Sequence, residues 1–511
     1  MKKNVERIVK VQQGKLRGTI GRNPEISVFR GVPYAAPPTG PLRWRPPQKP
    51  IAWQGVRACN REPVIPLQQQ GQFADGGHFA EMYRSEDCLT LDVWTPAQKG
   101  EEEKYPVMVW CFGGSFQGGY ASDSMYDSEL LAAKGIVCVT LNMRVGVMGY
   151  LCHPDLVKES DAHTCGNYGL LDIAFALQWI QENIHAFSGD PKQVVLVGQS
   201  TGAMSLCRLV ASGLIDGLYA GLILQSGDPL VDFPIFCCGY DQALKEGQRF
   251  AEALGADSID ALRALPPDAF YPNGENLYTR IIGHPCVPVQ DPIYFATPFE
   301  LSLFTQRTSN VPMLLGSNAD DAFSIHPCTP TELRTNIKAR FTRFAEEVLK
   351  LYPFSTTSQA LKVQNRIERD FWFARLRYIA LVREKIGHTK TWQYFFTQPY
   401  LWPGIGIVGA VHVSELPYVF GSIRLLRGYN YPWDETNDHV FQIMSSFWGS
   451  FIQRRDPNVS WLPFWHTRDA NHSYMEIGLH TGMQSDDMVL TPPQLDLWTR
   501  YCQYRTGITV E

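Results

Sequence analysis

Five short apolar segments, each ended by turn residues, set the strongest limit on the architecture of this chain. They span residues 107–112, 136–141, 194–197, 222–224 and 311–315. Segments of helical length lie between several of them, the clearest over residues 170–187. Apolar strands that alternate with helices predict an α/β fold, with a large, mostly parallel central sheet flanked by helices on both faces. This architecture alone indicates no function.

The chain has no internal repeat and no Gly/Ser-rich or charged linker that would divide it. Large α/β enzymes can carry one extended sheet with inserted loops, so we expect a single domain over residues 1–511. Hydrophobic residues make up 44% of the chain and charged residues 19%, which is typical of a globular protein with an extensive core.

Charge and hydropathy limit the partners of the protein. The formal net charge of −5 gives no reason to expect nucleic acid or an anionic membrane as a partner. Glu6, Arg7 and Lys10 interrupt the stretch in which a signal peptide would be apolar, and the apolar run 136–152 is too short to cross a bilayer. We therefore expect a soluble, cytoplasmic protein. The sequence leaves its oligomeric state open.

The cysteines favour neither a disulfide scaffold nor a metal site. Twelve cysteines in 511 residues are too few for such a scaffold, and no pair of Cys-x-x-Cys motifs occurs. We expect buried thiols, no zinc and no cofactor.

Residues 198–202 form a Gly-x-Ser-x-Gly pentapeptide between an apolar strand and a helix-like segment. This context predicts a nucleophile elbow, in which a tight turn presents Ser200 at the sheet edge above a helix N-terminus. Side chains at Gly198 and Gly202 would collide with neighbouring backbone in such a turn. An ordinary strand-to-helix turn is the alternative for the pentapeptide alone.

Longer ordered matches accompany the pentapeptide. They are FRGVPYA at 29–35, SEDCL at 85–89, GNYGLLD at 166–172, ALQW at 176–179 and DPN at 456–458. With them the sequence resembles the type-B carboxylesterase (cholinesterase-like) family of the α/β-hydrolase fold over nearly its whole length. The resemblance implies a serine-dependent ester hydrolase that works through an acyl-enzyme.

The family's catalytic triad has the order serine, acid, histidine, and two downstream segments fit it. In GSNADDA at 316–322, Asp321 stands where the family usually has glutamate, and Asp320 is the alternative acid. In GAVHVSE at 409–415, His412 fits the family's Gly-x-x-His-x-x-Glu. His412 would take the proton of Ser200 and return it to the leaving alcohol, while Asp321 would hold the correct imidazole tautomer. Without the resemblance, two solvated loop aspartates would be the simpler interpretation.

The resemblance also implies an oxyanion hole in the Gly-rich segment CFGGSF at 111–116. Its donors would be the backbone amides of Gly114, Ser115 and Thr201, with Gly113 supporting the loop. The family more often has a third glycine at the Ser115 position and alanine at the Thr201 position. Two larger side chains are therefore expected to narrow the site.

Other departures from the family pattern bear on compartment. Secreted members commonly join the position of Cys88 to a second cysteine, and the matching position here is Pro66. A second family disulfide would begin near Ala256. The loss of both agrees with a reducing compartment. A bridge between Cys59 and Cys88 stays open.

Two departures near the nucleophile bear on the substrate. Gln199 replaces a glutamate of many relatives, and residues 71–84 contain no tryptophan that would hold a choline group. We therefore expect an esterase of small to medium neutral esters rather than a cholinesterase. The alternatives are a specialised lactonase or amidase, or a catalytically silent adhesion module of the same fold. Such modules usually lack a triad member, whereas all three can be assigned here.

Overall fold

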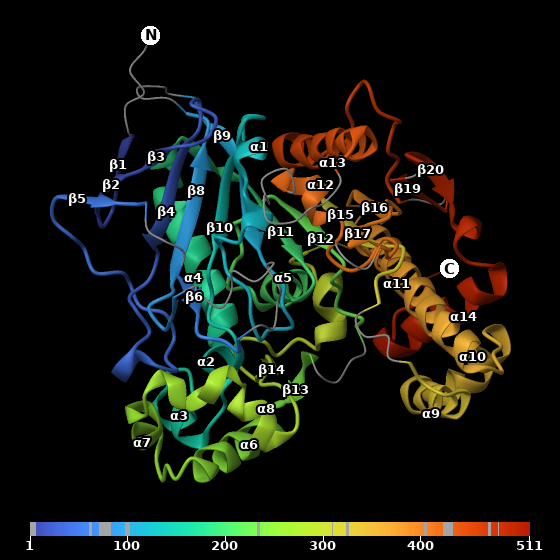
Figure 1. Ribbon diagram of the computed structural model, residues 1–511, viewed down its shortest axis with the longest axis horizontal. Helices are drawn as coiled ribbons and strands as arrows, with labels where there is room; N and C mark the ends of the chain where they lie inside the picture. Colours follow the sequence, from blue (N-terminus) through green and yellow to red (C-terminus); the bar gives the residue numbers. More distant parts are fainter. Residues whose placement is uncertain are drawn as a thin grey trace. The chain divides into compact units, whose positions relative to one another are not determined.

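The computed structural model describes residues 7–60, 64–70, 83–97, 103–231, 236–308, 310–322, 327–387, 389–402, 406–422, 433–468, 472–478 and 480–510. The chain forms two compact units, each with its own strands and helices (Figure 1). The first unit comprises Met1–Gly221 and Phe233–Phe299, and the second comprises Leu222–Asp232 and Glu300–Glu511. The chain thus enters the second unit briefly, returns to the first, and then completes the second.

The first unit contains a sheet of mixed direction. The strands β11 (Gly189–Gln199), β9 (Tyr105–Cys111) and β10 (Val137–Leu141) run parallel to one another, in that order. The strands β8 (Thr90–Thr95) and β4 (Ser27–Pro33) continue the sheet in antiparallel pairing. The parallel strands contain three of the predicted apolar segments, and the antiparallel strands lie outside all of them.

The second unit contains parallel strands in the order β12 (Gly221–Gln225), β15 (Met313–Asn318), β16 (Thr391–Phe396) and β19 (Ser473–Ile477). An antiparallel strand, β20 (Gly482–Ser485), follows β19. The predicted segments 222–224 and 311–315 become β12 and β15. All five predicted segments therefore pair in parallel.

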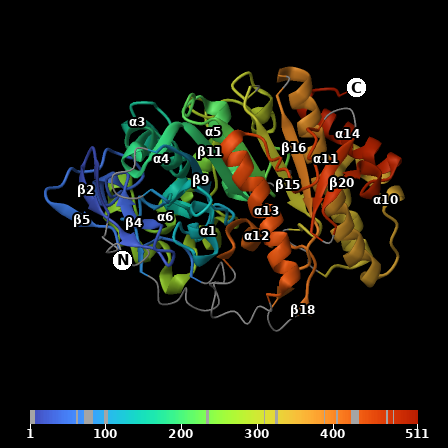
Figure 2. The ribbon, with the colours of Figure 1, turned by 90° about the horizontal axis from the view of Figure 1, so that it is seen from above.

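Helices cover both faces of the sheet in the second unit, as the alternation along β16 illustrates. Trp392 and Tyr394 pack against rings of α13 (Glu435–Arg454), with ring centroids 5.8 and 5.2 Å apart. Phe395 points the other way and packs against a ring of α11 (Thr357–Gly387) at 5.5 Å. Figure 2 shows both helices along these strands. Because successive side chains of a strand point to opposite faces and helices cover both faces, all six residues of β16 are buried, including the polar Thr391 and Gln393.

The helices of the first unit include the one predicted over residues 170–187. It is α4 (Tyr168–Asn183), continued by a 3₁₀ turn over Ile184–Phe187 and ended by Ser188 at a φ of 65°. The helix that follows β11 is α5 (Thr201–Ser212), and it contacts that strand. None of the helices in the described ranges is both long and apolar enough to cross a bilayer.

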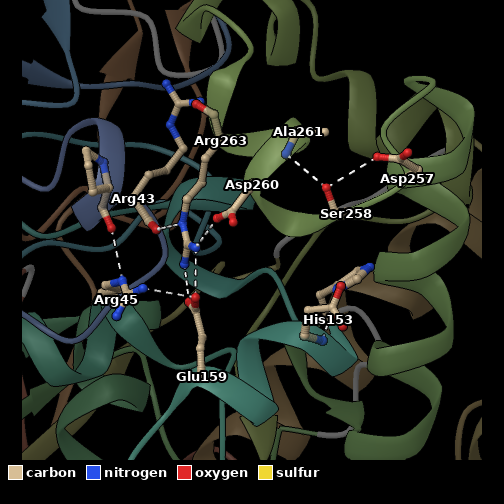
Figure 3. Close-up of polar contacts among 11 residues, drawn as sticks. Arg43, Arg45, His153, Glu159, Asp257, Ser258, Asp260, Ala261 and Arg263 are labelled. Carbon is tan, nitrogen blue, oxygen red and sulfur yellow. Dashed lines mark hydrogen bonds and ion pairs between the residues drawn. The ribbon is translucent and has the colours of Figure 1, made fainter.

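A polar cluster in the first unit joins three segments that are distant in sequence (Figure 3). Glu159, at the end of α3 (Pro154–Glu159), accepts hydrogen bonds from Arg45 at 3.0 Å and from Nη1 of Arg263 at 2.8 Å. The Arg263 Nε also donates to the carbonyl of Arg43 at 3.0 Å. The cluster holds the loop that contains Arg43 and Arg45 against α3 and α7 (Ile259–Ala264).

Candidate active site

Ser200 lies at the turn between β11 and α5, in a strained backbone conformation. Its φ is 55° and its ψ is −130°, which L-residues rarely adopt, and it is 3% exposed. Such strain costs on the order of 1–3 kcal/mol and persists only where the surrounding structure enforces it. The turn carries the serine directly onto the first turn of α5, where backbone amides have no acceptor within the helix.

Glycines make this turn possible by removing side chains from three crowded positions. A Cβ on Gly202 would lie 2.1 Å from the carbonyl oxygen of Cys111, on the end of β9. A Cβ on Gly198 would lie 2.7 Å from the amide nitrogen of Ala203. A Cβ on Gly113 would lie 2.7 Å from the Cβ of Ser200. The Gly-rich loop after β9 therefore lies directly against the turn that carries Ser200.

The loop after β9 holds three successive residues at positive φ. Gly114 has a φ of 129°, Ser115 of 55° and Phe116 of 61°. The Gly114 carbonyl accepts hydrogen bonds from the amides of Gln117, at 2.9 Å, and Gly118, at 3.2 Å. These bonds turn the loop back on itself. Ser115 and Phe116 thus hold a conformation that glycine would adopt without strain.

Asp321 and His412 are in direct contact in the second unit. The His412 Nδ1 lies 2.5 Å from Oδ1 of Asp321, whose side chain is fully buried. Oδ2 of Asp321 accepts the amide of Asn318, at the end of β15, at 2.9 Å. A carboxylate at Nδ1 favours the tautomer that carries its proton there, which leaves Nε2 with a lone pair to accept a proton. The imidazole is 18% exposed.

Asp320 makes different contacts from its neighbour. Its Oδ2 accepts the amide of Ala410 at 2.9 Å, and its own amide donates to the Ala410 carbonyl at 2.9 Å. A Cβ on Gly409 would lie 2.3 Å from the same carboxylate oxygen. Asp320 therefore binds the backbone that leads to His412.

A buried polar network surrounds the Asp321–His412 pair, and the sequence did not reveal it. The Glu415 carboxylate accepts Nδ2 of Asn318 at 2.6 Å and Nε2 of Gln225 at 3.1 Å. The Gln225 side chain in turn accepts Nε1 of Trp448 at 2.9 Å. Burial raises the pKa of Glu415; donation from Asn318 opposes this rise, and the nearby Asp321 carboxylate adds to it. Glu415 stood in the histidine motif, but its partners come from segments far away in sequence.

Two further strained residues escaped the sequence analysis. Val413, directly after His412, has a φ of 70°, which is unusual for a β-branched residue. Ser226, just after β12, has a φ of 45° and is fully buried. Nothing in their residue types predicts these conformations. Only the context of a tight turn could have indicated them.

The predicted residues fall into two groups. The first unit holds Ser200, the three glycines and the proposed oxyanion donors. The second unit holds Asp321 and His412. Gln199, 2% exposed, directly precedes Ser200. The predicted lack of a choline-binding ring concerns residues 71–84, most of which lie outside the described residues.

Comparison with known proteins gives one consistent result. The sequence model of the carboxylesterase family matches residues 5–498. The chain is 32% identical to the fumonisin B1 esterase of Sphingopyxis macrogoltabida, over 92% of this chain and 86% of the relative. It is 30% identical to the para-nitrobenzyl esterase of Bacillus subtilis (strain 168), over 94% of this chain and 97% of the relative. It is also 28% identical to the human cocaine esterase, over 95% and 89% of the two chains.

Proposed function

Because the chain belongs to the carboxylesterase family, with its α/β-hydrolase fold, we propose that it hydrolyses small to medium, uncharged carboxylic esters with Ser200 as its nucleophile. The observation that carries this proposal is the position of Ser200. It is buried and strained between β11 and the first turn of α5, with a Gly-rich loop against it. Oriented amides beside a serine suit the tetrahedral intermediate of acyl transfer.

The proposed reaction has two halves that use the same residues. His412 takes the hydroxyl proton as Ser200 attacks the ester carbonyl, and it then gives the proton to the leaving alcohol. Asp321 holds the imidazole and stabilises its protonated form. Water then attacks the acyl-enzyme, with His412 again as the base. The amides of Gly114, Ser115 and Thr201 are the proposed donors to the oxyanion in both halves.

The reaction needs both units, so the chain over residues 1–511 is proposed to act as one catalytic domain. The nucleophile belongs to the first unit, and the base and acid belong to the second. Loss of fluorophosphonate labelling at Ser200 in a His412→Ala variant would support this dependence. Labelling at the wild-type rate in that variant would contradict it.

A cytoplasmic location is also part of the proposal. Each of the twelve cysteines, all of which lie in the described ranges, carries a reduced thiol, including Cys59 and Cys88. Proteins of oxidising compartments use disulfides far more often. Fractionation of the native source, with detection by antibody, tests this location directly.

The names of the relatives span chemically different esters, so they do not select one substrate for this chain. A panel of esters varied separately in acyl and alcohol parts, with matched lactones and amides, would separate a general esterase from a lactonase or amidase. A silent binding module would hydrolyse none of them and would resist labelling.

The decisive test is labelling of the purified protein by a fluorophosphonate, which reacts with activated serines. The wild type should be labelled, and Ser200→Ala should lose labelling and nearly all ester hydrolysis. Ser226→Ala is the matched control, because Ser226 is also buried, strained and placed after a strand. Equal labelling of Ser200→Ala and the wild type would refute the assignment.

A further inference from the structure

The loop that carries two of the proposed oxyanion donors needs external support. Ser115 and Phe116 are consecutive non-glycine residues at φ values of 55° and 61°. Each such residue is disfavoured by contacts of its own Cβ, so the loop would relax if its neighbours did not hold it. What holds the loop therefore decides where its amides point.

Contacts on both sides of Phe116 fix the end of the loop. The Phe116 carbonyl accepts the amide of Gly146 at 2.7 Å. Its ring packs edge-on against Tyr150 and Phe236, at centroid distances of 5.6 and 6.3 Å. Its amide donates to the side-chain hydroxyl of Thr201 at 3.3 Å, in a buried environment. This last bond joins the loop to the first residue of α5.

The hydrogen bond between the Phe116 amide and Thr201 links the 114–116 loop to the start of α5, and the proposed oxyanion donors on these two segments must keep a fixed spacing. The Phe116 amide and the Ser115 amide flank the same Cα, so fixing the direction of one peptide restricts the other. Thr201 contributes its own backbone amide to the same proposed oxyanion hole. Its hydroxyl therefore ties one proposed donor to the segment that carries the other two.

Resting on the proposed function, we propose that the Thr201 hydroxyl is a positioning residue for the oxyanion hole, and that it stabilises the transition state of ester hydrolysis by holding the strained 114–116 loop in register with α5. The hydroxyl acts through the Phe116 amide and does not touch the substrate. An oxyanion forms only in the transition state, so misplaced donors lower kcat and leave KM nearly unchanged.

Three substitutions test the role of the hydroxyl on a neutral aryl ester. Thr201→Val keeps the shape but removes the acceptor, which leaves a buried amide unpaired, and we expect kcat to fall about 10- to 100-fold. Thr201→Ala should lower kcat about tenfold, part of the effect of losing one donor. Thr201→Ser restores the acceptor and should stay within about threefold of the wild type. In each variant KM should change less than about threefold.

A matched control lies one turn further along α5. The Ser205 hydroxyl is fully buried and donates to the Thr201 carbonyl at 2.8 Å, so Ser205→Ala removes a buried hydroxyl of the same helix without touching the loop. It should leave kcat unchanged. If Thr201→Val does not fold, Thr201→Ala and Thr201→Ser decide between the outcomes.

The outcomes separate this inference from the proposed function. If the wild type is active and Thr201→Ala leaves kcat unchanged, or changes only KM, the proposed role of the hydroxyl is wrong. The esterase proposal then still stands. A kcat loss in Thr201→Ser equal to that in Thr201→Ala also overturns the role of the hydroxyl. A wild type that neither hydrolyses esters nor reacts with a fluorophosphonate refutes the function itself.

Discussion

Two adjacent aspartates, Asp320 and Asp321, offer a paired test of which carboxylate serves the imidazole. Asp321→Asn should lower kcat by about 10⁴-fold, because an amide favours the wrong tautomer of His412. Asp320→Asn disturbs only the bond to the Ala410 amide, so it should affect stability more than kcat. Steady-state kinetics and thermal unfolding of both variants check this ranking. The reverse ranking would assign the role to Asp320.

The charge of the residue beside Ser200, the proposed nucleophile, leads to a second prediction. Gln199 is neutral, and a carboxylate there would favour a cationic ester by about 1–2 kcal/mol, or roughly tenfold. We therefore expect similar kcat/KM values for a choline ester and its uncharged 3,3-dimethylbutyl counterpart, which have nearly the same shape. Gln199→Glu should shift the ratio toward the choline ester. A wild-type preference for choline well above tenfold would mean that other carboxylates or rings line the pocket.

The sequence indicated the proposed catalytic residues, but it did not indicate most of the groups around them. The motifs indicated Ser200, Asp321 and His412, and the structure brings the last two into contact. The network around Glu415 was not predicted, because Gln225 lies 190 residues from its partner and only the folded sheet brings them together. The Thr201–Phe116 bond was missed for the same reason. The sequence predicted that the side chains of Ser115 and Thr201 narrow the site, but it did not predict which groups they form hydrogen bonds with.

At the scale of elements, the apolar pattern predicted five of the parallel strands. It missed the parallel strands β16 and β19 and the antiparallel strands β4 and β8. In β15 the apolar residues Met313, Leu314 and Leu315 stand together at the start of the strand, so the local sequence indicates it. In β4, buried and half-buried residues mix, and Gly31 and Pro33 interrupt the apolar run. This segment forms a strand because it pairs with β8, and the sequence of β4 alone does not reveal that pairing.

Two helices of the first unit are joined by an ion pair whose strength should depend on pH. His284 follows α8 (Leu277–Ile282), and its Nε2 lies 2.9 Å from Glu246 of α6 (Tyr240–Ala253), while Nδ1 lies 3.1 Å from the Pro285 carbonyl. Both ring nitrogens face acceptors, so the imidazolium fits best. Partial burial lowers the pKa of His284, but these two bonds outweigh it and raise the pKa overall.

The sign of the pH effect follows from that direction. A histidine whose pKa is raised on folding stabilises the protein fully below its ordinary value of about 6.5, and the contribution disappears as pH rises through the folded value. His284→Gln should therefore lower Tm more at pH 6 than at pH 9. Burial lowers the pKa of His153, whose Nδ1 accepts the Asp155 amide, so His153→Gln should show no such loss at low pH. Equal Tm losses for His284→Gln at both pH values would contradict the prediction.

For the molecule as a whole, the reduced cysteines predict a simple thiol count. Denatured protein should release twelve equivalents in an Ellman titration, and a reductant should not change Tm. In the native protein nine cysteines are buried, and Cys237, Cys238 and Cys328 are half-buried. Burial, with a contribution from Glu246, raises the pKa of Cys238 to about 12, so it should react slowly. Fewer than twelve thiols after denaturation would indicate a disulfide.

The brief passage of the chain through β12 has a consequence for synthesis of the protein. Leu222, Ile223 and Leu224 leave the ribosome well before β15, with which they pair in parallel. Until then the nascent chain exposes an apolar strand without that neighbour, a known route to aggregation. A protein truncated after Phe299 would lack β15, so its β12 strand would stay without this partner permanently. The first unit therefore cannot be cut from the gene as one continuous piece without also carrying β12 of the second unit. We expect chains made in this way to depend on chaperones.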